Sequence, residues 1–360
     1  MPDSARRLRA RRASAQLLSG AGGSTPTQVV GRLLAVQAQD LRAAKLALRA
    51  RGHGFTAAHV DRALTVDRSL VVAWLGRGTL HLVGAEDYPW LLGLTAPIGT
   101  GHSRRRLRQE GVSPDDADRA VAIVERALAE EGPLTRPELA ERIAACRITT
   151  EGQATPHLLA VAARRGVAVL GPVRNGTQAF ALTRDWLGAA PPGQLAGAER
   201  DAALSELARR YLAGHGPATA SDLAGWIGLP LRDARTGLQA IARQLTRLGG
   251  ELVEPATPRR TPARLPPRLL PAFDPYLLGW RDRSFAVPAE HSRLVHPGGG
   301  ILRAAATVDG LAVGTWSARR RGGRISVEIE PLAPLPGSAE RGLLDEAADV
   351  ARFEGLTLEN

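Results

Sequence analysis

The sequence predicts an α+β fold built from three tandem winged helix-turn-helix modules and a C-terminal β-rich part. Three observations support this prediction: a helix-capping pattern that occurs twice, short apolar strand pairs that follow helices, and a proline-rich segment before a strand-rich end. With 360 residues, 44% of them hydrophobic, the chain is long enough for several domains with sizeable cores. We expect the modules to cover residues 1–112, 113–190 and 191–262, and the C-terminal part to cover residues 263–360.

The first module is predicted from its apolar periodicity. A helix over residues 26–36 would place Val29, Val30, Leu33 and Leu34 on one inner face. The remaining expected elements are helices over 41–51 and 56–64 and a strand pair around Gly76-Arg77-Gly78 and residues 79–83. This order fits the winged-helix plan.

The second and third modules share a repeated helix start. In residues 132–140 and 216–224 a Gly-Pro turn precedes a threonine, and an acid stands three residues after that threonine. Thr135 with Glu138 and Thr219 with Asp222 therefore match the capping box, in which each side chain bonds the backbone of the other. Long helices are expected before these starts, over 114–130 and 199–213, and further helices after them, over 155–165 and 231–246.

A hairpin signal follows the last helix of the second module. Residues 167–170 and 178–182 are short apolar runs, and Asn175-Gly176 lies between them. Asn-Gly between two such runs is typical of a tight β-turn. Three helices followed by a two-stranded wing describe a winged helix-turn-helix.

The C-terminal part is predicted to be rich in antiparallel strands. It follows a proline-rich connection over 255–271, which cannot continue a helix. Strands over 301–307 and 311–316 would flank the Asp309-Gly310 turn, and a strand over 324–329 would follow Gly322-Gly323. A helix over 339–353, capped by Ser338, would end the chain.

Composition limits the chemistry. A single cysteine excludes a disulfide framework or a cluster that needs four thiolates, and the histidines show no zinc-ligand spacing, so we expect neither metal nor cofactor. The N-terminal residues are charged and no apolar run is long enough to span a bilayer, so we expect a cytoplasmic protein associated with the nucleoid and not with a membrane. Basic residues outnumber acidic ones 47 to 36, which favours a polyanionic partner, nucleic acid first.

The stretch Leu34-Ala35-Val36-Gln37-Ala38-Gln39-Asp40 interrupts the apolar pattern with two amides and an acid. Residues two apart point roughly 200° apart on a helix, so Gln37 and Gln39 can serve one ligand only if the helix ends near Val36. Neutral amides can hold a water molecule or a sugar oxygen but cannot take a proton at neutral pH. Such a pair suits cleavage of a glycosidic bond whose leaving base is already cationic, with Asp40 stabilising the developing charge on the sugar. The structural alternative makes Gln37 a helix-end residue and Asp40 the N-cap of helix 41–51.

Three segments together resemble a known family. Residues 33–40 (LLAVQAQD), 74–83 (WLGRGTLHLV) and 270–283 (LPAFDPYLLGWRDR) are similar to signatures of the AlkZ/YcaQ winged-helix DNA glycosylases. Gln37 and Gln39 match the Gln-apolar-Gln motif of the AlkZ branch, whereas the YcaQ branch has aspartate at the second position. The resemblance implies a C-shaped arrangement around a DNA channel, and catalysis by Gln37 and Gln39, which position a water molecule.

The resemblance also implies a substrate and a partner. The substrate would be double-stranded DNA carrying N7- or N3-alkylated purines, among them bulky natural-product adducts or interstrand crosslinks, in DNA repair or self-resistance. We expect a monomer. The only lysine is Lys45, which we interpret as a surface residue, so water is the expected nucleophile and a strand-nicking lyase step, which needs an amine, is not expected.

Further candidate residues are less specific. Arginines beside predicted turns and a helix end could contact phosphates: Arg164, Arg165, Arg174, Arg319, Arg320, Arg321 and Arg324. His81 would either line the pocket or lie in the core. Asp274, Arg281 and Asp282 are interpreted as a buried ion-pair hinge between the C-terminal part and the helical modules, with a direct role of Asp274 at the lesion as the second interpretation.

Two other functions fit part of the sequence. A winged-helix transcription regulator without enzymatic activity would explain the predicted modules, although such a regulator usually needs one module and a dimer interface. A resistance protein that sequesters the alkylating compound is the third hypothesis. Release of an alkylated base from DNA, and loss of that release when Gln37 or Gln39 is substituted, would support the glycosylase hypothesis over both of these alternatives.

Overall fold

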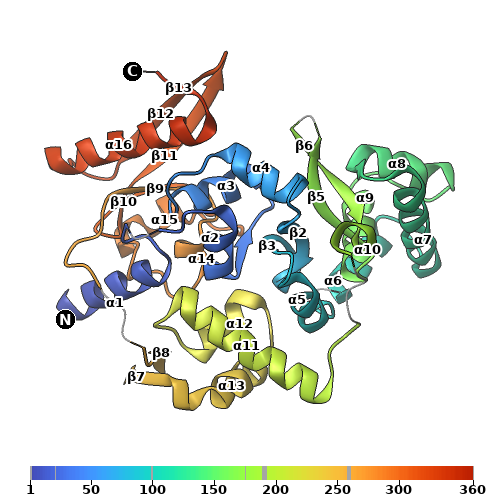
Figure 1. Cartoon of the computed structure of the whole chain (residues 1–360), viewed down its shortest axis with the longest axis horizontal. Coiled ribbons are helices and arrows are strands. Elements are labelled where there is room, and N and C mark those ends of the chain that lie inside the picture. Colours follow the sequence, from blue (N-terminus) through green and yellow to red (C-terminus); the bar gives the residue numbers. More distant parts are fainter. Residues whose placement is uncertain are drawn as a thin grey trace. The chain divides into compact units, whose positions relative to one another are not determined.

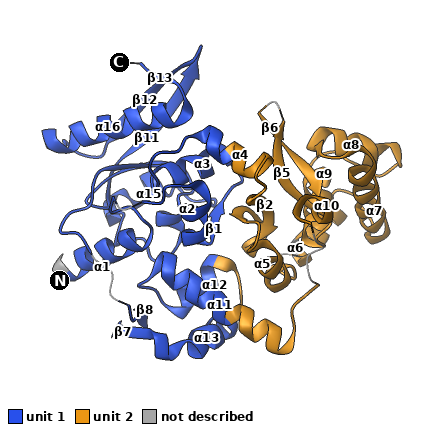
Figure 2. Cartoon of the chain, in the orientation of Figure 1, with its two compact units in different colours: residues 1–60, 205–226, 231–360 blue, residues 61–204, 227–230 orange. Residues whose placement is uncertain are grey.

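The computed structural model describes residues 2–20, 22–98, 100–174, 176–188, 193–257 and 261–359. The chain divides into two compact units (Figure 2): unit 1 comprises residues 1–60, 205–226 and 231–360, and unit 2 comprises residues 61–204 and 227–230. Both units combine helices with strands, so the predicted α+β class is confirmed. The division into four segments stays a prediction.

Unit 1 contains a five-stranded sheet in the order β13-β12-β11-β10-β9. The chain turns at Gly322-Gly323, where Arg321 pairs with Arg324, and at Asp309-Gly310, where Val308 pairs with Leu311, as the sequence predicts. Helix α16 packs on this sheet (Figure 1), and its buried side chains include Leu343, Val350 and Phe353. The strands are β9 (Arg268–Leu270), β10 (Ala305–Val308), β11 (Leu311–Arg321), β12 (Arg324–Pro331) and β13 (Thr357–Leu358); α16 spans Gly337–Glu354.

The other elements of unit 1 come from both ends and the middle of the chain (Figure 1). The helices are α1 (Pro2–Ala15), α2 (Pro26–Leu33), α3 (Leu41–Arg49), α12 (Ala220–Ile227), α13 (Leu231–Ala240), α14 (Pro275–Leu278) and α15 (Ser292–Val295). The short strands are β1 (Ala35–Gln37) and the hairpin of β7 (Leu245–Gly249) and β8 (Leu252–Pro255). Helices α4 (Ala57–Thr65) and α11 (Gly197–His215) each belong to both units, as does α12 through its last residue, Ile227.

Helix α1 is absent from the predicted elements because its many arginines hide any apolar periodicity. In the structure these arginines tie α1 to distant segments: Arg6 pairs with Asp309, Arg11 with Glu254, Arg9 donates to the Phe285 carbonyl, and Arg12 donates to the Pro217 carbonyl. Hydrogen bonds and ion pairs of its arginine side chains therefore hold α1 in place, a role that an apolar helix face usually has.

Several predicted boundaries are wrong; strand β11, for example, extends to Arg321 and not to residue 316. The helix from Pro26 ends at Leu33 and not at residue 36, because Leu34 adopts a left-handed backbone with φ of 67°. The helix from Leu231 ends at Ala240, and residues up to 255 form the unpredicted β7–β8 hairpin. Helix α16 starts one residue before Ser338, which lies inside the first turn and does not cap it. Strand β10 starts at Ala305 and not at residue 301.

Unit 2 is built around strands in the order β3-β2-β5-β6-β4, all neighbours being antiparallel. Both predicted hairpins are present, β2–β3 around Gly76–Gly78 and β5–β6, although Asn175 of the second turn lies outside the described residues. The strands are β2 (Leu70–Leu75), β3 (Thr79–Gly84), β4 (Leu134–Thr135), β5 (Ala168–Arg174) and β6 (Thr177–Leu182). The helices are α5 (Tyr88–Thr95), α6 (Thr100–Gln109), α7 (Pro114–Glu131), α8 (Arg136–Ala145), α9 (Ala154–Arg164) and α10 (Thr183–Leu187).

Both capping boxes are confirmed. Thr135 donates backbone and hydroxyl hydrogens to the Glu138 carboxylate at the start of α8. At the start of α12, Asp222 accepts from the Thr219 backbone, and its own amide donates to the Thr219 hydroxyl. These reciprocal bonds satisfy backbone donors that a helix start otherwise leaves unpaired.

An aromatic cluster forms part of the core of unit 1. The His215 ring is fully buried, stacks on Tyr211 with centroids 4.8 Å apart, and lies 5.7 Å from the Trp280 ring. The Arg12 guanidinium covers the Trp280 and Phe285 rings at 4.7 and 4.4 Å. Burial lowers the pKa of His215 to about 3, so the folded chain keeps this imidazole neutral.

His215 should make the fold sensitive to mild acid. The unfolded chain takes up a proton as the pH falls through about 6.5, whereas folded His215 stays neutral until about 3, so stability falls as the pH decreases between these values. From pH 7 to pH 5 this loss is about 2 kcal/mol. We expect His215→Phe to reduce the measured loss by about that amount in urea unfolding at both pH values. His53→Phe, at an exposed histidine, is the control, and equal losses in all three proteins would contradict the prediction.

Candidate functional site

The Gln37–Gln39 segment is extended and lies between two helices. Helix α2 ends at Leu33, and the next residue, Leu34, is buried with its backbone in the left-handed region. Strand β1 then carries Gln37, so the two glutamines lie on one face of an extended chain, as their joint action requires. A left-handed leucine costs about 1–3 kcal/mol and persists only where the surroundings hold it.

The two amide side chains contact each other. Gln37 Nε2 donates a hydrogen bond of 2.6 Å to Gln39 Oε1. Gln39 is exposed and Gln37 is half-buried, so the pair is open to solvent. In the described part of the chain, the Gln39 Nε2 group has no hydrogen-bond partner. The pair can therefore offer an amide hydrogen to a water molecule or a sugar oxygen.

Asp40 has the capping role of the structural alternative. Its Oδ1 accepts from the Ala43 backbone at 3.1 Å and caps α3. The carboxylate is exposed at the N-terminus of this helix, where the helix dipole stabilises negative charge. Asp40 thus ends the extended segment and fixes its exit into α3.

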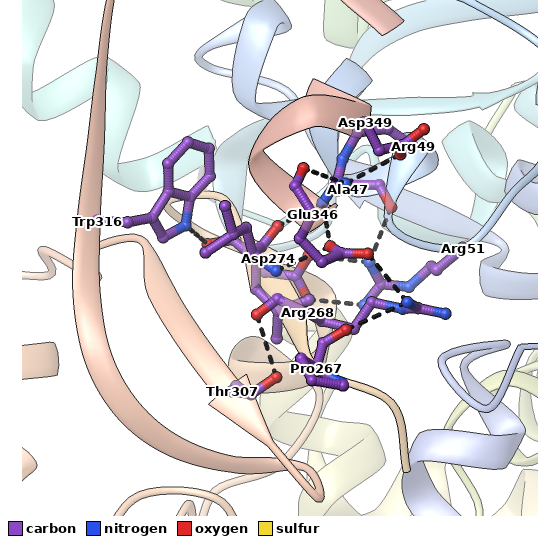
Figure 3. A network of polar contacts seen from close by, with 12 residues as sticks. Ala47, Arg49, Arg51, Pro267, Arg268, Asp274, Thr307, Trp316, Glu346 and Asp349 are labelled. Carbon is purple, nitrogen blue, oxygen red and sulfur yellow. Dashed lines mark hydrogen bonds and ion pairs between the residues drawn. The ribbon is translucent and has the colours of Figure 1, made fainter. Parts of the chain in front are cut away.

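Helix α3 is fixed to α16 at both of its ends. At the start, Arg42 forms two hydrogen bonds with Glu354, of 2.7 and 3.1 Å. At the end, the buried Arg49 donates to the Glu346 carboxylate at 2.9 Å, to Asp349 at 3.1 Å and to the Leu269 carbonyl of β9 at 2.7 Å (Figure 3). Glu346 also accepts from Arg268 and from the Leu269 backbone. The segment before α3 is therefore held by the C-terminal part of the chain.

Asp274 lies in a second buried ion pair. Both of its oxygens accept from Arg51, at 2.6 and 2.8 Å, and both side chains are completely buried. Arg51 also donates to the Ala47 carbonyl and to Gln16 (Figure 3 shows the Arg51 contacts to Ala47 and Asp274). Asp274 additionally caps α14 through the Tyr276 backbone. The pair joins the segment directly after α3 to the C-terminal part.

The predicted partners of Asp274 are wrong, because the expected cluster does not form. The backbone amide of Arg281 donates to Asp222, and Asp282 accepts from Ser284 and is exposed. Asp274 points to Arg51 because its position before α14 directs it inward, whereas Arg281 and Asp282 follow the helix in an open turn. The buried position of Asp274 leaves its carboxylate no access to a substrate.

His81 is a buried residue of β3 in unit 2. One ring nitrogen contacts the Thr79 carbonyl at 3.0 Å. Burial lowers its pKa to about 4, so the imidazole is neutral at pH 7. This buried position corresponds to the second of the two interpretations from the sequence, a histidine in the core.

The arginines of the β11–β12 hairpin fall on two faces. Arg320 faces α16 and donates to Glu354 at 2.6 Å. Burial alone would raise the pKa of Glu354, but hydrogen bonds from Arg320 and Arg42 lower it below its ordinary value. Arg319, Arg321 and Arg324 lie on the opposite, exposed face by strand alternation and pairing, and none has an ion-pair partner in the part of the chain that the structure describes.

The three candidate arginines of unit 2 have protein partners. Arg164 is half-buried and donates to Ser103 Oγ at 2.7 Å, and burial lowers its pKa. Arg165 forms an exposed ion pair with Asp118. Arg174 donates to the Pro133 carbonyl at 2.6 Å. An exposed pair is weak, so Arg165 and Arg174 can exchange these partners for phosphates more easily than Arg164 can.

Sequence reasoning missed Arg42, Arg49, Arg51 and Glu346. A hint exists: Arg49 and Arg51 end an amphipathic helix inside an apolar stretch, where a free charge would not be tolerated. Their partners stand more than 200 positions away and could not be identified from the sequence. Among the described residues no group of three or more His, Cys, Asp or Glu side chains could hold a metal ion. No described helix is long and apolar enough to cross a membrane.

Comparison with known proteins identifies the class. A family model described as "DNA glycosylase AlkZ-like" matches residues 30–353, a range that includes the amide pair and helix α3. The chain therefore belongs to the AlkZ-like DNA glycosylase family.

Two comparisons agree over nearly the whole chain. A curated relative from Streptomyces sahachiroi, "Interstrand DNA cross-link repair glycosylase", is 29% identical over 377 residues, covering 99% of this chain and 98% of the relative. The solved structure of the Streptomyces sahachiroi DNA glycosylase AlkZ has a TM-score of 0.79 at 28% identity, with 98% of each chain covered.

The buried Arg51–Asp274 pair should contribute strongly to stability. We expect Asp274→Asn to lower the free energy of unfolding by about 3–5 kcal/mol, because Arg51 would keep a buried, uncompensated charge. Asp67→Asn removes an exposed pair with Arg62 and should cost less than about 1 kcal/mol. Urea unfolding of both variants measures the difference. Equal losses would show that the buried pair is not an anchor.

Proposed function

We propose that this chain is a monofunctional DNA glycosylase that hydrolyses the N-glycosidic bond of N7- or N3-alkylated purines, with Gln37 and Gln39 as the catalytic residues. The observation that carries the proposal is the 2.6 Å contact between two solvent-open amides on an extended, anchored segment. Membership of the DNA glycosylase family supports it.

The proposed step needs no strong base. The bond between the sugar C1′ and the purine nitrogen breaks, and its electron pair neutralises the cationic alkylated base. A water oxygen held by the amide pair forms the new bond to C1′, and the surplus proton passes to solvent. The transition state carries positive charge on the sugar, which the exposed Asp40 carboxylate would stabilise. Amides can orient water for this attack without titrating.

The absence of a lyase step is part of the proposal. A lyase uses an amine to form a Schiff base with the sugar. Lys45, the only lysine of the chain, is half-buried on α3 and already has an interaction partner. Water is therefore the proposed nucleophile.

The name of the Streptomyces sahachiroi relative supports a bulky substrate. That protein is described as an interstrand crosslink repair glycosylase. We extend this to the present chain as a proposal: bulky natural-product adducts or crosslinks in double-stranded DNA, removed in repair or self-resistance.

Winged-helix modules are proposed for DNA binding. Three segments have the required order of three helices and a hairpin along the chain: α2, α3 and α4 with β2–β3, α7, α8 and α9 with β5–β6, and α11, α12 and α13 with β7–β8. The charge surplus and the exposed arginines support a phosphate partner. The C-shaped arrangement around DNA and the monomeric state belong to the same proposal.

Removal of either amide should slow base release strongly. We expect Gln37→Ala and Gln39→Ala each to lower the rate of 7-methylguanine release from duplex DNA by about 100-fold or more, because water is no longer positioned. Strand cleavage after heating in alkali measures release. Gln244→Ala, at an exposed glutamine of the same unit, should keep the wild-type rate.

Two results would contradict the proposed activity. One is equal release by wild type and both variants, which would remove the amide pair from catalysis. The other is no release from 7-methylguanine or bulkier adducts combined with sequence-specific duplex binding, which would favour a transcription regulator.

The hairpin arginines offer a matched test of DNA binding. Arg319→Ala should weaken binding to undamaged duplex DNA and reduce the slope of log K against log salt by about 1, the value for one lost phosphate contact. Arg320→Ala, one residue away, should leave the slope nearly unchanged because Arg320 is already paired with Glu354. Fluorescence anisotropy at several salt concentrations measures both slopes. Equal slopes in the two variants would contradict the prediction.

A further inference from the structure

Unit 2 contains a small cavity beside the Gly76–Gly78 turn, with a volume of about 240 Å³. Trp74, at the end of β2, and Arg77 line one side, and Gln153 and His157, at the start of α9, line another. Arg164, near the end of α9, is a further lining residue. The volume is below that of a site for a drug-sized molecule, and it suits a single ring system.

Two side chains of this cavity lack polar partners. The Trp74 ring is half-buried and stacks on Phe180, with centroids 6.1 Å apart and planes inclined by 14°. Neither its indole N–H nor the exposed amide of Gln153 has a hydrogen-bond partner among the residues that the structure describes. An aromatic surface, a free N–H and a free amide in one cavity are the groups that bind a flat heteroaromatic ring.

The wall of the cavity is rigid. Arg164 is held by Ser103 Oγ at 2.7 Å and contacts the Gly78 carbonyl at 3.5 Å. Gly78 has a left-handed backbone with φ of 78°, and a Cβ there would lie 2.6 Å from an Arg164 guanidinium nitrogen. A side chain here would displace the Arg164 guanidinium, and the positive φ favours glycine. A preformed wall reduces the ordering cost of binding.

We propose that this cavity binds a guanine-type base, namely the alkylated guanine that the proposed reaction releases. The inference rests on the proposed function. The Arg77 side chain can donate to the O6 acceptor of guanine, and the Gln153 amide can donate or accept at the ring edge. The ring itself stacks on Trp74.

Charge selects the released base over the intact nucleotide. Guanine alkylated at N7 is cationic while it is attached to the sugar, and it becomes neutral when the glycosidic bond breaks. Arg77 and Arg164 both line the cavity, and their positive charges disfavour a cation there. The cavity therefore binds the released alkylated guanine, whereas Gln37 and Gln39 act in the preceding hydrolysis.

The test is calorimetric titration of the full-length protein with free 7-methylguanine and, separately, with free 3-methyladenine, which lacks O6. We expect 7-methylguanine to bind more tightly. Gln153→Ala and Trp74→Ala should each weaken its binding about tenfold, whereas Trp74→Phe, which keeps the aromatic face, should retain most of the affinity. Gln109→Ala, at an exposed glutamine of the same unit, should bind as wild type does. Thermal unfolding checks that every variant is folded.

Three results would each overturn the proposal: no binding of 7-methylguanine to wild type, unchanged binding to folded Gln153→Ala, or equal affinity for 3-methyladenine. The same titration of Gln37→Ala separates this proposal from the proposed reaction, because that variant should lose base release and keep base binding. If wild type binds the base in this cavity without releasing it from DNA, the reaction is wrong and the site remains.

Discussion

Two buried arginines, Arg49 at the end of α3 and Arg51 just after it, need compensation for their charge, and the position of the candidate active site depends on this compensation. A guanidinium without partners is very unfavourable in a protein interior. Arg49 donates to Glu346, to Asp349 and to the Leu269 carbonyl, and Arg51 pairs with Asp274. All of these partners lie in the last third of the chain. The C-terminal part thereby fixes the helix that begins directly after the amide pair.

The segment with the amide pair is constrained from both sides. Leu34 ends α2 with a left-handed backbone, and Asp40 starts α3 as its N-cap. Between them the chain is extended, and this brings the Gln37 and Gln39 side chains to one face. Groups that orient a water molecule work best when rigid elements hold them. The strain at Leu34 is compatible with such a site, because strained residues persist where surrounding packing fixes them.

The basic surplus of the chain serves two purposes. Arginines of α1, α3 and β11 hold distant segments together through carbonyls and carboxylates, as Arg12, Arg49 and Arg320 illustrate. Arg319, Arg321 and Arg324 lie exposed on the opposite face of the hairpin. Composition alone counts both groups equally, so it overstates the charge that is available to a polyanion. The alternation of β11 separates the two groups within consecutive residues.

The sequence by itself determined the local features of this protein: the capping boxes at Thr135 and Thr219, the hairpin turns, the α+β class and the break in periodicity at the amide pair. These features depend on neighbouring residues, and so their signals are readable in one chain. The early end of α2, the β7–β8 hairpin and the partners of Arg51 and Asp274 were decided by the tertiary structure. A left-handed leucine has no signature in its own residue type, and an ion pair between positions 223 apart depends on how the whole unit folds. The cavity beside Trp74 is likewise tertiary, because β2 and α9 supply its two sides.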